Sequence, residues 1–284
     1  MHKLALVIDD PVLLSQWEDA VKRSTGVVRS TEEEADAVIT YTVTAVQKSM
    51  QHGLHVLVCF DETIDSSVLE ELNITCQKAP VQLMVASHLR FSPAFQQICN
   101  SLETGQLGEP GVVRIHRWLP SGKGDMLARL TDEIDLAIGI FGVMPNTVYG
   151  FSNGDEGSYV HAHLGFPDGG MVLIDVSLTL PPGDDYYSFS LIGSDGSAYA
   201  DDHHNVHLMY AGGMPCAHRN PTDPVLNRIS MLEAFSRLLT GTETVTCDIP
   251  ALLSARKVTA TVIQSIQANQ SWILSQDGET YACS

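Results

Sequence analysis

The fold is decided by two neighbouring stretches, Val85-Ala-Ser-His-Leu-Arg-Phe-Ser-Pro-Ala-Phe-Gln-Gln-Ile98 and Gly105-Gln-Leu-Gly-Glu-Pro-Gly-Val-Val-Arg-Ile-His116. The apolar run at 81–86 predicts a buried strand. Ser92-Pro93 then predicts the start of a helix, because serine is a good N-cap and proline fits the first helical turn. We expect this helix to end at Gly105 and a second strand to follow it.

The loop between the first strand and the helix carries His88 and Arg90. Open α/β sheets bind their ligands beyond the carboxyl ends of the strands, so both side chains are candidate ligand-binding groups. The loop also marks the junction of two different halves of the chain. We therefore expect a domain boundary between residues 92 and 93.

The segments Arg90-Phe-Ser-Pro93 and Gly105-Gln-Leu-Gly108 resemble the linking segment of the Gfo/Idh/MocA family of sugar and polyol oxidoreductases. The resemblance implies a fold that is α/β plus α+β. It places a truncated Rossmann-like domain at 1–92 and a C-terminal domain with a large, mainly antiparallel open sheet at 93–284. It also implies that a long helix at about 250–267 packs back toward the first domain.

Composition limits the partners and the compartment. The chain has 284 residues and a net charge of −18, which argues against nucleic acid as a partner because phosphates would be repelled. Its six cysteines show no C-x-x-C spacing. No apolar run approaches the roughly 20 residues needed to cross a bilayer. The composition therefore predicts a cytoplasmic protein with reduced thiols and with neither nucleic acid nor a membrane as a partner.

The first strand–helix turn contains Asp9-Asp10-Pro11, where a dinucleotide-binding protein has G-x-G-x-x-G. Without glycine, the backbone cannot make the tight turn that approaches a pyrophosphate. Asp9 and Asp10 add negative charge, and Pro11 removes one N–H donor. The same residues suit an ordinary helix N-terminus capped by aspartate. The sequence therefore predicts a degenerate cofactor site at Asp9, Asp10 and Pro11.

Two further elements of the nucleotide domain depart from the family pattern. The strand that should end in the acid for the adenosine ribose is predicted to be merged or missing, and we expect no basic residue for a 2′-phosphate. The lysine of the family aligns with Phe60, beside Cys59, which we interpret as a buried thiol at the end of a strand. We therefore predict no NAD or NADP binding, although the resemblance alone implies NAD(P).

Candidate catalytic residues come from the segment Thr131-Asp-Glu-Ile-Asp135, which resembles the family helix D-x-G-x-H-x-x-D. Asp132 aligns with the catalytic histidine of the family and is a candidate base. His88 or His116 would be its acid partner. The alternative is that Asp132 and Glu133 interact with the helix dipole as residues of the first turn.

The resemblance implies a sugar or polyol ligand, for which Arg90, Asp135, Arg114 and His163 are the candidate binding residues. His161 and His163 alternate along a predicted strand and so share one face of the sheet. That face either lines the ligand pocket or forms the open sheet surface, and we favour the second option. Because monomers rarely leave so large a surface bare, we predict a homodimer or homotetramer through it, including His161 or His163.

The most metal-like segment is Asp201-Asp-His-His-Asn-Val-His207, since histidine, aspartate and asparagine can bind metals. In an extended segment, however, His203, His204 and His207 would not all share one face. A polar hairpin or loop explains the composition equally well. We therefore predict no metal and name these three histidines as the candidates.

Three functions stay open. The first is a sugar or polyol oxidoreductase with an atypical cofactor site, and the second is a non-catalytic relative that binds a small ligand or another protein. The third is a cofactor-independent lyase or hydrolase. The resemblance favours the first and the residues favour the second, so the sequence alone leaves open whether the protein is an enzyme.

Overall fold

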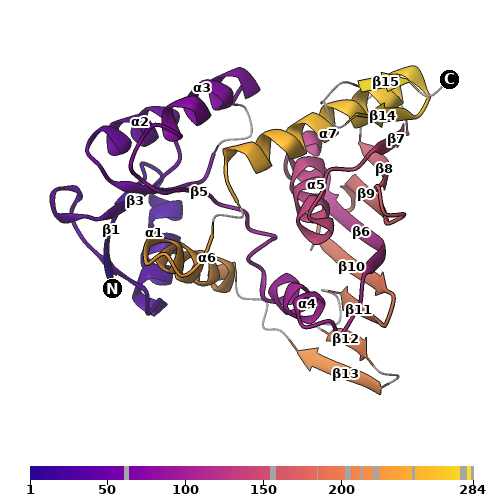
Figure 1. Ribbon diagram of the computed structural model, residues 1–284, viewed down its shortest axis with the longest axis horizontal. Coiled ribbons are helices and arrows are strands. Elements are labelled where there is room, and N and C mark those ends of the chain that lie inside the picture. Colours follow the sequence, from indigo (N-terminus) through magenta and orange to yellow (C-terminus); the bar gives the residue numbers. More distant parts are fainter. Residues whose placement is uncertain are drawn as a thin grey trace. The chain divides into compact units, whose positions relative to one another are not determined.

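The computed structural model describes residues 1–60, 64–153, 158–183, 185–201, 206–211, 214–219, 224–244, 247–275 and 280–282. The chain divides into two compact units. Unit 1 comprises Met1–Pro93 and Asp223–Leu253, and unit 2 comprises Ala94–Thr222 and Ser254–Ser284. Figure 1 labels the helices and strands of both units.

Unit 1 is built on a five-stranded sheet in the order β2-β1-β3-β4-β5, and all of its neighbouring strands are parallel. Its strands are β1 (His2–Val7), β2 (Val27–Arg29), β3 (Ala37–Thr40), β4 (His55–Val58) and β5 (Leu83–Val85). All four residues of β3 are buried, as expected for a parallel strand that is covered on both faces.

Helices cover both faces of this sheet. They are α1 (Pro11–Arg23), α2 (Val43–Gln51), α3 (Ser66–Cys76), α6 (Pro224–Leu239) and the first turn of α7 (Ile249–Ala268). Trp17 of α1 and Phe235 of α6 belong to one apolar core with Ile39 of β3. Val46 of α2 and Leu69 of α3 belong to the other core. The alternation of side chains along each strand separates the two cores.

Strand β2 is present, so the prediction that it is merged or missing was wrong. Val27–Arg29 pairs in parallel with β1, with Val27 buried and the other two residues exposed. Three residues with one buried side chain give too short an apolar pattern to recognise. Compared with the usual dinucleotide order 3-2-1-4-5-6, the unit lacks the outermost strand. The short 3-10 helix η1 (Glu32–Glu34) leads from β2 to β3 instead.

The chain passes from unit 1 to unit 2 after Pro93, one residue from the predicted boundary. Residues Asp223–Leu253, which the prediction assigned to the second domain, belong to unit 1. The reason is that α6 contributes fully buried residues such as Leu232 and Phe235 to a core of unit 1. The long C-terminal helix α7 also begins there, since Ile249 is buried in the other core.

Unit 2 is built on a ten-stranded sheet in the order β13-β12-β11-β10-β6-β9-β8-β7-β14-β15. Only the central pair β6–β9 is parallel among the described pairs. The strands are β6 (Pro110–Pro120), β7 (Thr147–Ser152), β8 (Tyr159–Gly165), β9 (Met171–Leu180), β10 (Tyr186–Gly193), β11 (Gly196–Asp201), β12 (Val206–Ala211), β13 (Met214–Arg219), β14 (Trp272–Leu274) and β15 (Thr280–Ala282). The predicted fold class, α/β plus α+β with a large, mainly antiparallel sheet, is confirmed.

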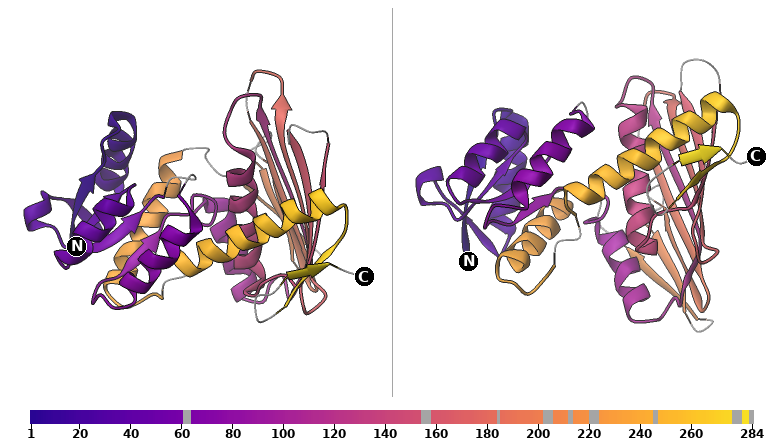
Figure 2. Two further views of the ribbon diagram at one scale, coloured as in Figure 1. Left: turned by 90° about the horizontal axis from the view of Figure 1, so that it is seen from above. Right: turned by 45° about the horizontal axis from the view of Figure 1, so that its top comes forward.

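The helices of unit 2 lie on one face of its sheet and leave the other face open (Figure 2). They are α4 (Pro93–Glu103), α5 (Met126–Phe141) and the part of α7 after Leu253. Residues that point toward the helices, such as Ile115, Ile174 and Leu191, are fully buried. We call this side the helix face and the opposite side the open face.

Candidate functional site

An aspartate in the turn between β1 and α1 caps the N-terminus of α1. Asp10 is the N-cap of α1, and its Oδ1 accepts the N–H groups of Val12 at 2.8 Å and Leu13 at 2.9 Å. Pro11 has no N–H to offer. Backbone N–H groups at such a helix N-terminus are the donors that bind the pyrophosphate of a dinucleotide. Here two of them are already satisfied by a carboxylate of the chain itself.

The other positions that a nucleotide fold uses also lack the expected groups. Cys59, which follows β4, is buried, and this burial raises the pKa of its thiol to about 12, so it is not a reactive thiolate at neutral pH. Phe60 packs on a core of unit 1 and supplies no cation in place of the family's lysine. Neither position therefore carries the group that the family resemblance implies for NAD(P) chemistry.

The end of β2 corrects one detail of the sequence analysis. Arg29 is exposed at the last position of that strand, where an acid would bind an adenosine ribose. A guanidinium near this place is the group that accommodates a 2′-phosphate. The expectation of no basic residue was wrong because it followed from the supposed loss of the strand.

Tyr41 follows β3 and joins the packing of unit 1. Trp17 Nε1 donates a hydrogen bond to Tyr41 Oη at 2.8 Å. Burial raises the pKa of Tyr41 above its usual value, so its phenol is neutral. Arg228 of α6 stacks on Trp17, with its guanidinium carbon 5.6 Å from the ring centre, and donates to Gln16 at 2.6 Å. These contacts give the side chains beside β3 a structural role in joining α1 to α6.

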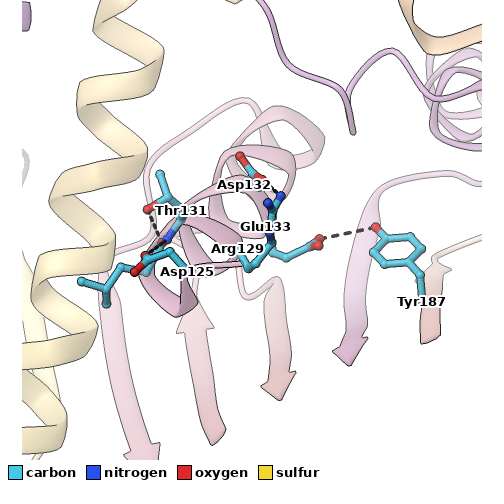
Figure 3. Close-up of polar contacts among 8 residues, drawn as sticks. Asp125, Arg129, Thr131, Asp132, Glu133 and Tyr187 are labelled. Carbon is cyan, nitrogen blue, oxygen red and sulfur yellow. Dashed lines mark hydrogen bonds and ion pairs between the residues drawn. The ribbon is translucent and has the colours of Figure 1, made fainter. Parts of the chain in front are cut away.

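In unit 2, helix α5 begins earlier than the sequence suggested. Asp125 is its N-cap and accepts the N–H of Ala128 at 2.9 Å, so the helix starts at Met126 (Figure 3). Asp132 and Glu133 consequently lie in the second turn, and their interpretation as first-turn dipole partners was wrong. Asp132 is half exposed and pairs with Arg129 at 3.2 Å on the helix surface.

Glu133 points the other way, from α5 toward the sheet (Figure 3). It is only 1% exposed, and the hydroxyl of Tyr187 lies 3.4 Å from its Oε2. Burial raises the pKa of Glu133 to about 8, although the positive charge of Arg117 opposes the shift. Arg117 and Tyr187 sit opposite each other on β6 and β10, and the guanidinium carbon lies 5.5 Å from the phenol ring centre. The helix face thus carries a carboxylic acid that is neutral at pH 7.

Glu133 was missed by sequence reasoning, although a signal was present. Leu130, Ile134 and Ala137 are buried and lie at i−3, i+1 and i+4 from Glu133, which places this acid on the apolar side of α5. The resemblance drew attention to its neighbour Asp132 instead. Helix phase was the better guide to which of the two acids faces the sheet.

The open face holds a second carboxylate, Asp175 of β9. Its Oδ1 is 2.7 Å from His161 Nδ1 and accepts a hydrogen bond from Tyr159 Oη at 2.7 Å. Its Oδ2 is 3.1 Å from His116 Nδ1. Burial alone would raise the pKa of Asp175, but these three donors hold it well below its usual range. Sequence reasoning named His116 and the histidines of β8 but not the aspartate that joins them.

The predicted catalytic residues do not come together. Asp132 lies on α5 above the helix face, whereas His116 lies on the open face with Asp175. His88 is exposed in a loop of unit 1, where its carbonyl oxygen accepts a hydrogen bond from Asn227 at 3.2 Å. The sheet separates Asp132 from His116, so these two cannot act on one substrate atom.

The predicted substrate residues are also distributed over different surfaces. Asp135 is half-buried on α5, and Arg90 is half-buried in a loop of unit 1. Arg114 and His163 lie on the open face. His163 lines a groove of about 580 Å³ together with nine other residues. These are Asn146, Thr147, Tyr149, Gly165, Phe166, Gly169, Gly170, Met171 and Ser271.

The structure offers no metal site among the residues that it describes, where no group of three or more histidine, cysteine, aspartate or glutamate side chains could hold an ion. His203 and His204 lie outside the described residues. His207 is on β12, paired across the ladder with His218 of β13. Within the described part, no helix combines the length and apolar character that crossing a membrane requires.

The parallel unit and the one-sided antiparallel unit together define the two-domain oxidoreductase fold of the Gfo/Idh/MocA type. An NAD-binding oxidoreductase of Klebsiella pneumoniae has a TM-score of 0.81 at 12% identity, covering 97% of this chain and 99% of that chain. The UDP-N-acetylglucosamine 3-dehydrogenase GnnA of Acidithiobacillus ferrooxidans has a TM-score of 0.75 at 16% identity, covering 94% and 98%.

A third similar structure is an oxidoreductase of Agrobacterium radiobacter in complex with NAD+, L-tartaric acid and magnesium, with a TM-score of 0.73 and 16% identity. The match covers 95% of this chain and 97% of that chain. No protein-family model matches this sequence, and no curated protein matches it either. At these identities the likeness to solved structures shows the fold and not the activity.

Proposed function

We propose that this protein has the fold of a sugar dehydrogenase but does not transfer hydride to NAD or NADP, and that it binds a small hydroxylated ligand of the sugar or polyol class. The observation that carries the first part is the capping of α1 by Asp10. The described cysteines Cys59, Cys76, Cys99 and Cys247 are not in disulfide bonds, which supports a reducing compartment, and we place the protein in the cytoplasm.

Energetics support the loss of dinucleotide binding. A pyrophosphate would have to displace the Asp10 carboxylate from two N–H groups, and losing such a cap costs about 1 kcal/mol. The displaced carboxylate would then lie beside the phosphates, where like charges repel. Asp9 adds a second negative charge to the same turn. The helix terminus thus disfavours the anion that it would normally attract.

The ligand class is supported by an exposed pair of side chains on α5 and by the solved structures of similar fold. Arg129 and Asp132 present a guanidinium and a half-exposed carboxylate on α5, which are groups that hydrogen-bond hydroxyls. Sugar chemistry is named for one solved structure of similar fold, a UDP-N-acetylglucosamine 3-dehydrogenase. We therefore assign the Arg129–Asp132 pair to ligand binding, without a role in hydride transfer.

Titration with NADH and NADPH tests the first part. We expect no saturable binding by fluorescence or calorimetry for the wild type, and none for a variant with glycine at Asp9 and Pro11, because the lysine position is still Phe60. Dissociation with a Kd near 10 µM, about −7 kcal/mol, would overturn the proposal. An Arg29→Ala variant serves as the control for NADPH, since loss of weak NADPH binding there would locate it at β2.

A thermal-shift screen with sugars, polyols and nucleotide sugars tests the second part. We expect at least one of them to raise the Tm of the wild type, and the R129Q/D132N variant to lose this rise. The matched control is D19N/R23Q, which removes an exposed ion pair of similar spacing on α1, where the pair is 3.6 Å apart. Equal shifts in both variants would remove the α5 pair from the ligand site.

We further propose that the chain forms a homodimer or homotetramer through the open face. Exposed apolar side chains on this face support the assembly, namely Phe151, Met171, Ile192 and Tyr199. Among the described residues of β6 to β10, the open face carries one arginine, Arg114, and one acid, Asp175. In a chain with a net charge of −18, the fixed charges on this part of the open face therefore cancel, which favours contact with a second copy there.

Light scattering tests the assembly. We expect more than one copy per particle at micromolar concentration and pH 7.5, and a monomer for F151E/Y199E, which places carboxylates on both sides of a self-complementary contact. A wild type that is monomeric at about 50 µM would contradict this proposal.

A further inference from the structure

The open face carries a cluster of titratable groups that ligand binding does not use, formed by Asp175, His116, His161 and Tyr159. We propose that protonation of His161, held beside Asp175, separates the copies that assemble through this face, so that the protein dissociates when the pH falls. The inference rests on the proposed assembly through the open face and names its regulation.

The geometry fixes where the protons go. Both imidazoles turn Nδ1 toward the Asp175 carboxylate, at 2.7 Å for His161 and 3.1 Å for His116. In His161, which makes the hydrogen bond, Nδ1 therefore carries the hydrogen of the neutral ring, and Nε2 is the nitrogen left to accept a proton. The side chains of His116 and His161 are 35% and 30% exposed, so water reaches them in the free chain. A second copy on this face would remove that water.

The charges around the cluster decide the sign of the effect. On β9, Asp175 is ionised, because three donors hold its pKa well below the usual range. On β6, Arg114 is exposed and positive. On β8, Tyr159 stays neutral, since burial raises its pKa to about 12, and burial lowers the pKa of His163. Among the described residues of β6, β8 and β9, the fixed charges of Arg114 and Asp175 cancel, so an imidazolium adds a net positive charge to this part of the face.

Self-association turns this added charge into repulsion. In a two-fold interface the same patch lies on both copies, so every imidazolium meets the region that carries its own counterpart. The free chain favours the charged form of His161, because its hydrogen bond to Asp175 raises its pKa. Loss of water in the interface disfavours the same charged form. Free copies therefore bind more protons than assembled copies, and acidification shifts the equilibrium toward free copies.

The charge of the whole chain works in the opposite direction. The sequence pI is about 4.8, so lowering the pH toward this value reduces the overall negative charge and the general repulsion between copies. Without the histidine cluster, association would tighten on acidification. If self-association weakens on acidification, the local histidine cluster and not the overall charge is therefore the cause.

Analytical ultracentrifugation of the full chain at pH 7.5, 6.5 and 5.5 tests the inference. For the wild type we expect the Kd of self-association to rise at least tenfold from pH 7.5 to pH 5.5. The variant H116N/H161N keeps an amide donor near each Nδ1 position and has no imidazole beside Asp175. Its Kd should stay constant or fall over the same range. His52→Asn is the matched control, because His52 Nδ1 also bonds within its own unit, to Lys48 O at 2.7 Å, but lies on α2 of unit 1.

Each result decides between outcomes. A wild-type Kd that stays constant or falls on acidification overturns the inference while leaving the assembly in place, and so does a histidine variant that keeps the wild-type dependence. A wild type that is monomeric at pH 7.5 overturns both the assembly and its regulation. Circular dichroism at pH 5.5 must show a folded free chain, since dissociation caused by unfolding would also overturn the inference.

Discussion

Two covered carboxylates on opposite faces of one sheet have pKa values that shift in opposite directions. Glu133 on the helix face is nearly inaccessible, has Tyr187 at 3.4 Å, and has a pKa raised to about 8. Asp175 on the open face is also largely covered, with a side chain 17% exposed, yet its pKa is lowered. Both lose water, but only Asp175 has three close donors. The number of donors, more than the depth of burial, decides whether a covered acid is charged.

The largest expected effect comes from replacing the neutral acid, in Glu133→Gln. Its raised pKa means that the folded state favours the protonated form, so stability is present at low pH and lost as the pH rises from 4.5 to about 8. Because of Glu133, the free energy of unfolding of the wild type should fall by on the order of 4 kcal/mol between pH 5 and pH 9. The glutamine variant should avoid that loss.

Urea unfolding of both proteins at pH 5, 7 and 9 measures the difference. Asp132→Asn is the control. Asp132 is next to Glu133 in sequence but half exposed, so replacing it should change the pH dependence of stability little. Parallel stability curves for wild type and Glu133→Gln would mean that Glu133 is not neutral in the folded state.

The next effect concerns the close packing of the helix face. A Cβ at Gly150 of β7 would lie 2.6 Å from the carbonyl oxygen of Val262 on α7. Gly150→Ala should therefore destabilise the protein by about 2 to 3 kcal/mol, as in overpacked cores. Phe151→Ala is the paired change on the open face, where the ring is 51% exposed, and should cost less than about 1 kcal/mol in the free chain. Equal costs in thermal unfolding would contradict the distinction between the faces.

Asp175→Asn should cost about 2 kcal/mol at pH 7, because His116, His161 and Tyr159 lose a charged acceptor. A lowered aspartate pKa stabilises the fold above the unfolded pKa, and this contribution is lost as the pH falls. The difference between wild type and variant should therefore shrink toward pH 3. Chemical denaturation at pH 7 and pH 3 checks this, and a cost that grows in acid would reverse the assignment.

The smallest effect is expected for Tyr159→Phe, which removes one hydrogen bond to Asp175 at 2.7 Å. The free energy of unfolding should fall by about 1 kcal/mol. NMR titration should also show the Asp175 carboxyl titrating at higher pH than in the wild type, because one stabilising donor is gone. An unchanged Asp175 titration would remove Tyr159 from the cluster.

Much of the fold followed from local patterns in the sequence. The helix at Ser92-Pro93 and the turn at Gly105 were predicted because they depend on neighbouring residues alone, and Gly105 has a φ of 73°. Strand β2 was missed because its three residues gain their structure from pairing with β1. Residues 223–253 were assigned to the second domain because a helix pattern does not say which core it enters.

The candidate site was harder to predict than the fold. Aligning Asp132 with a catalytic histidine drew attention to an exposed residue. The buried acid with the shifted pKa is its neighbour Glu133. The Asp175 cluster brings together β6, β8 and β9, and no local pattern reports which side chains three strands place side by side. The sequence does show which side chains alternate along a strand, and this alternation correctly placed His161 and His163 on one face.

The discontinuity of unit 1 has a consequence for biosynthesis. Residues 1–93 leave the ribosome first, but α6, which supplies Met231, Leu232 and Phe235 to their core, follows only after the whole of 94–222. At about 5 to 20 residues per second, the nascent sheet waits for several seconds or longer with one apolar side covered by α1 but not by α6. Chaperones that bind exposed apolar surface have this interval in which to act. Unit 2 is completed by residues 254–284 only after the chain has returned to finish unit 1, so the two units cannot be completed one after the other in a simple order from 1 to 284 without this interruption.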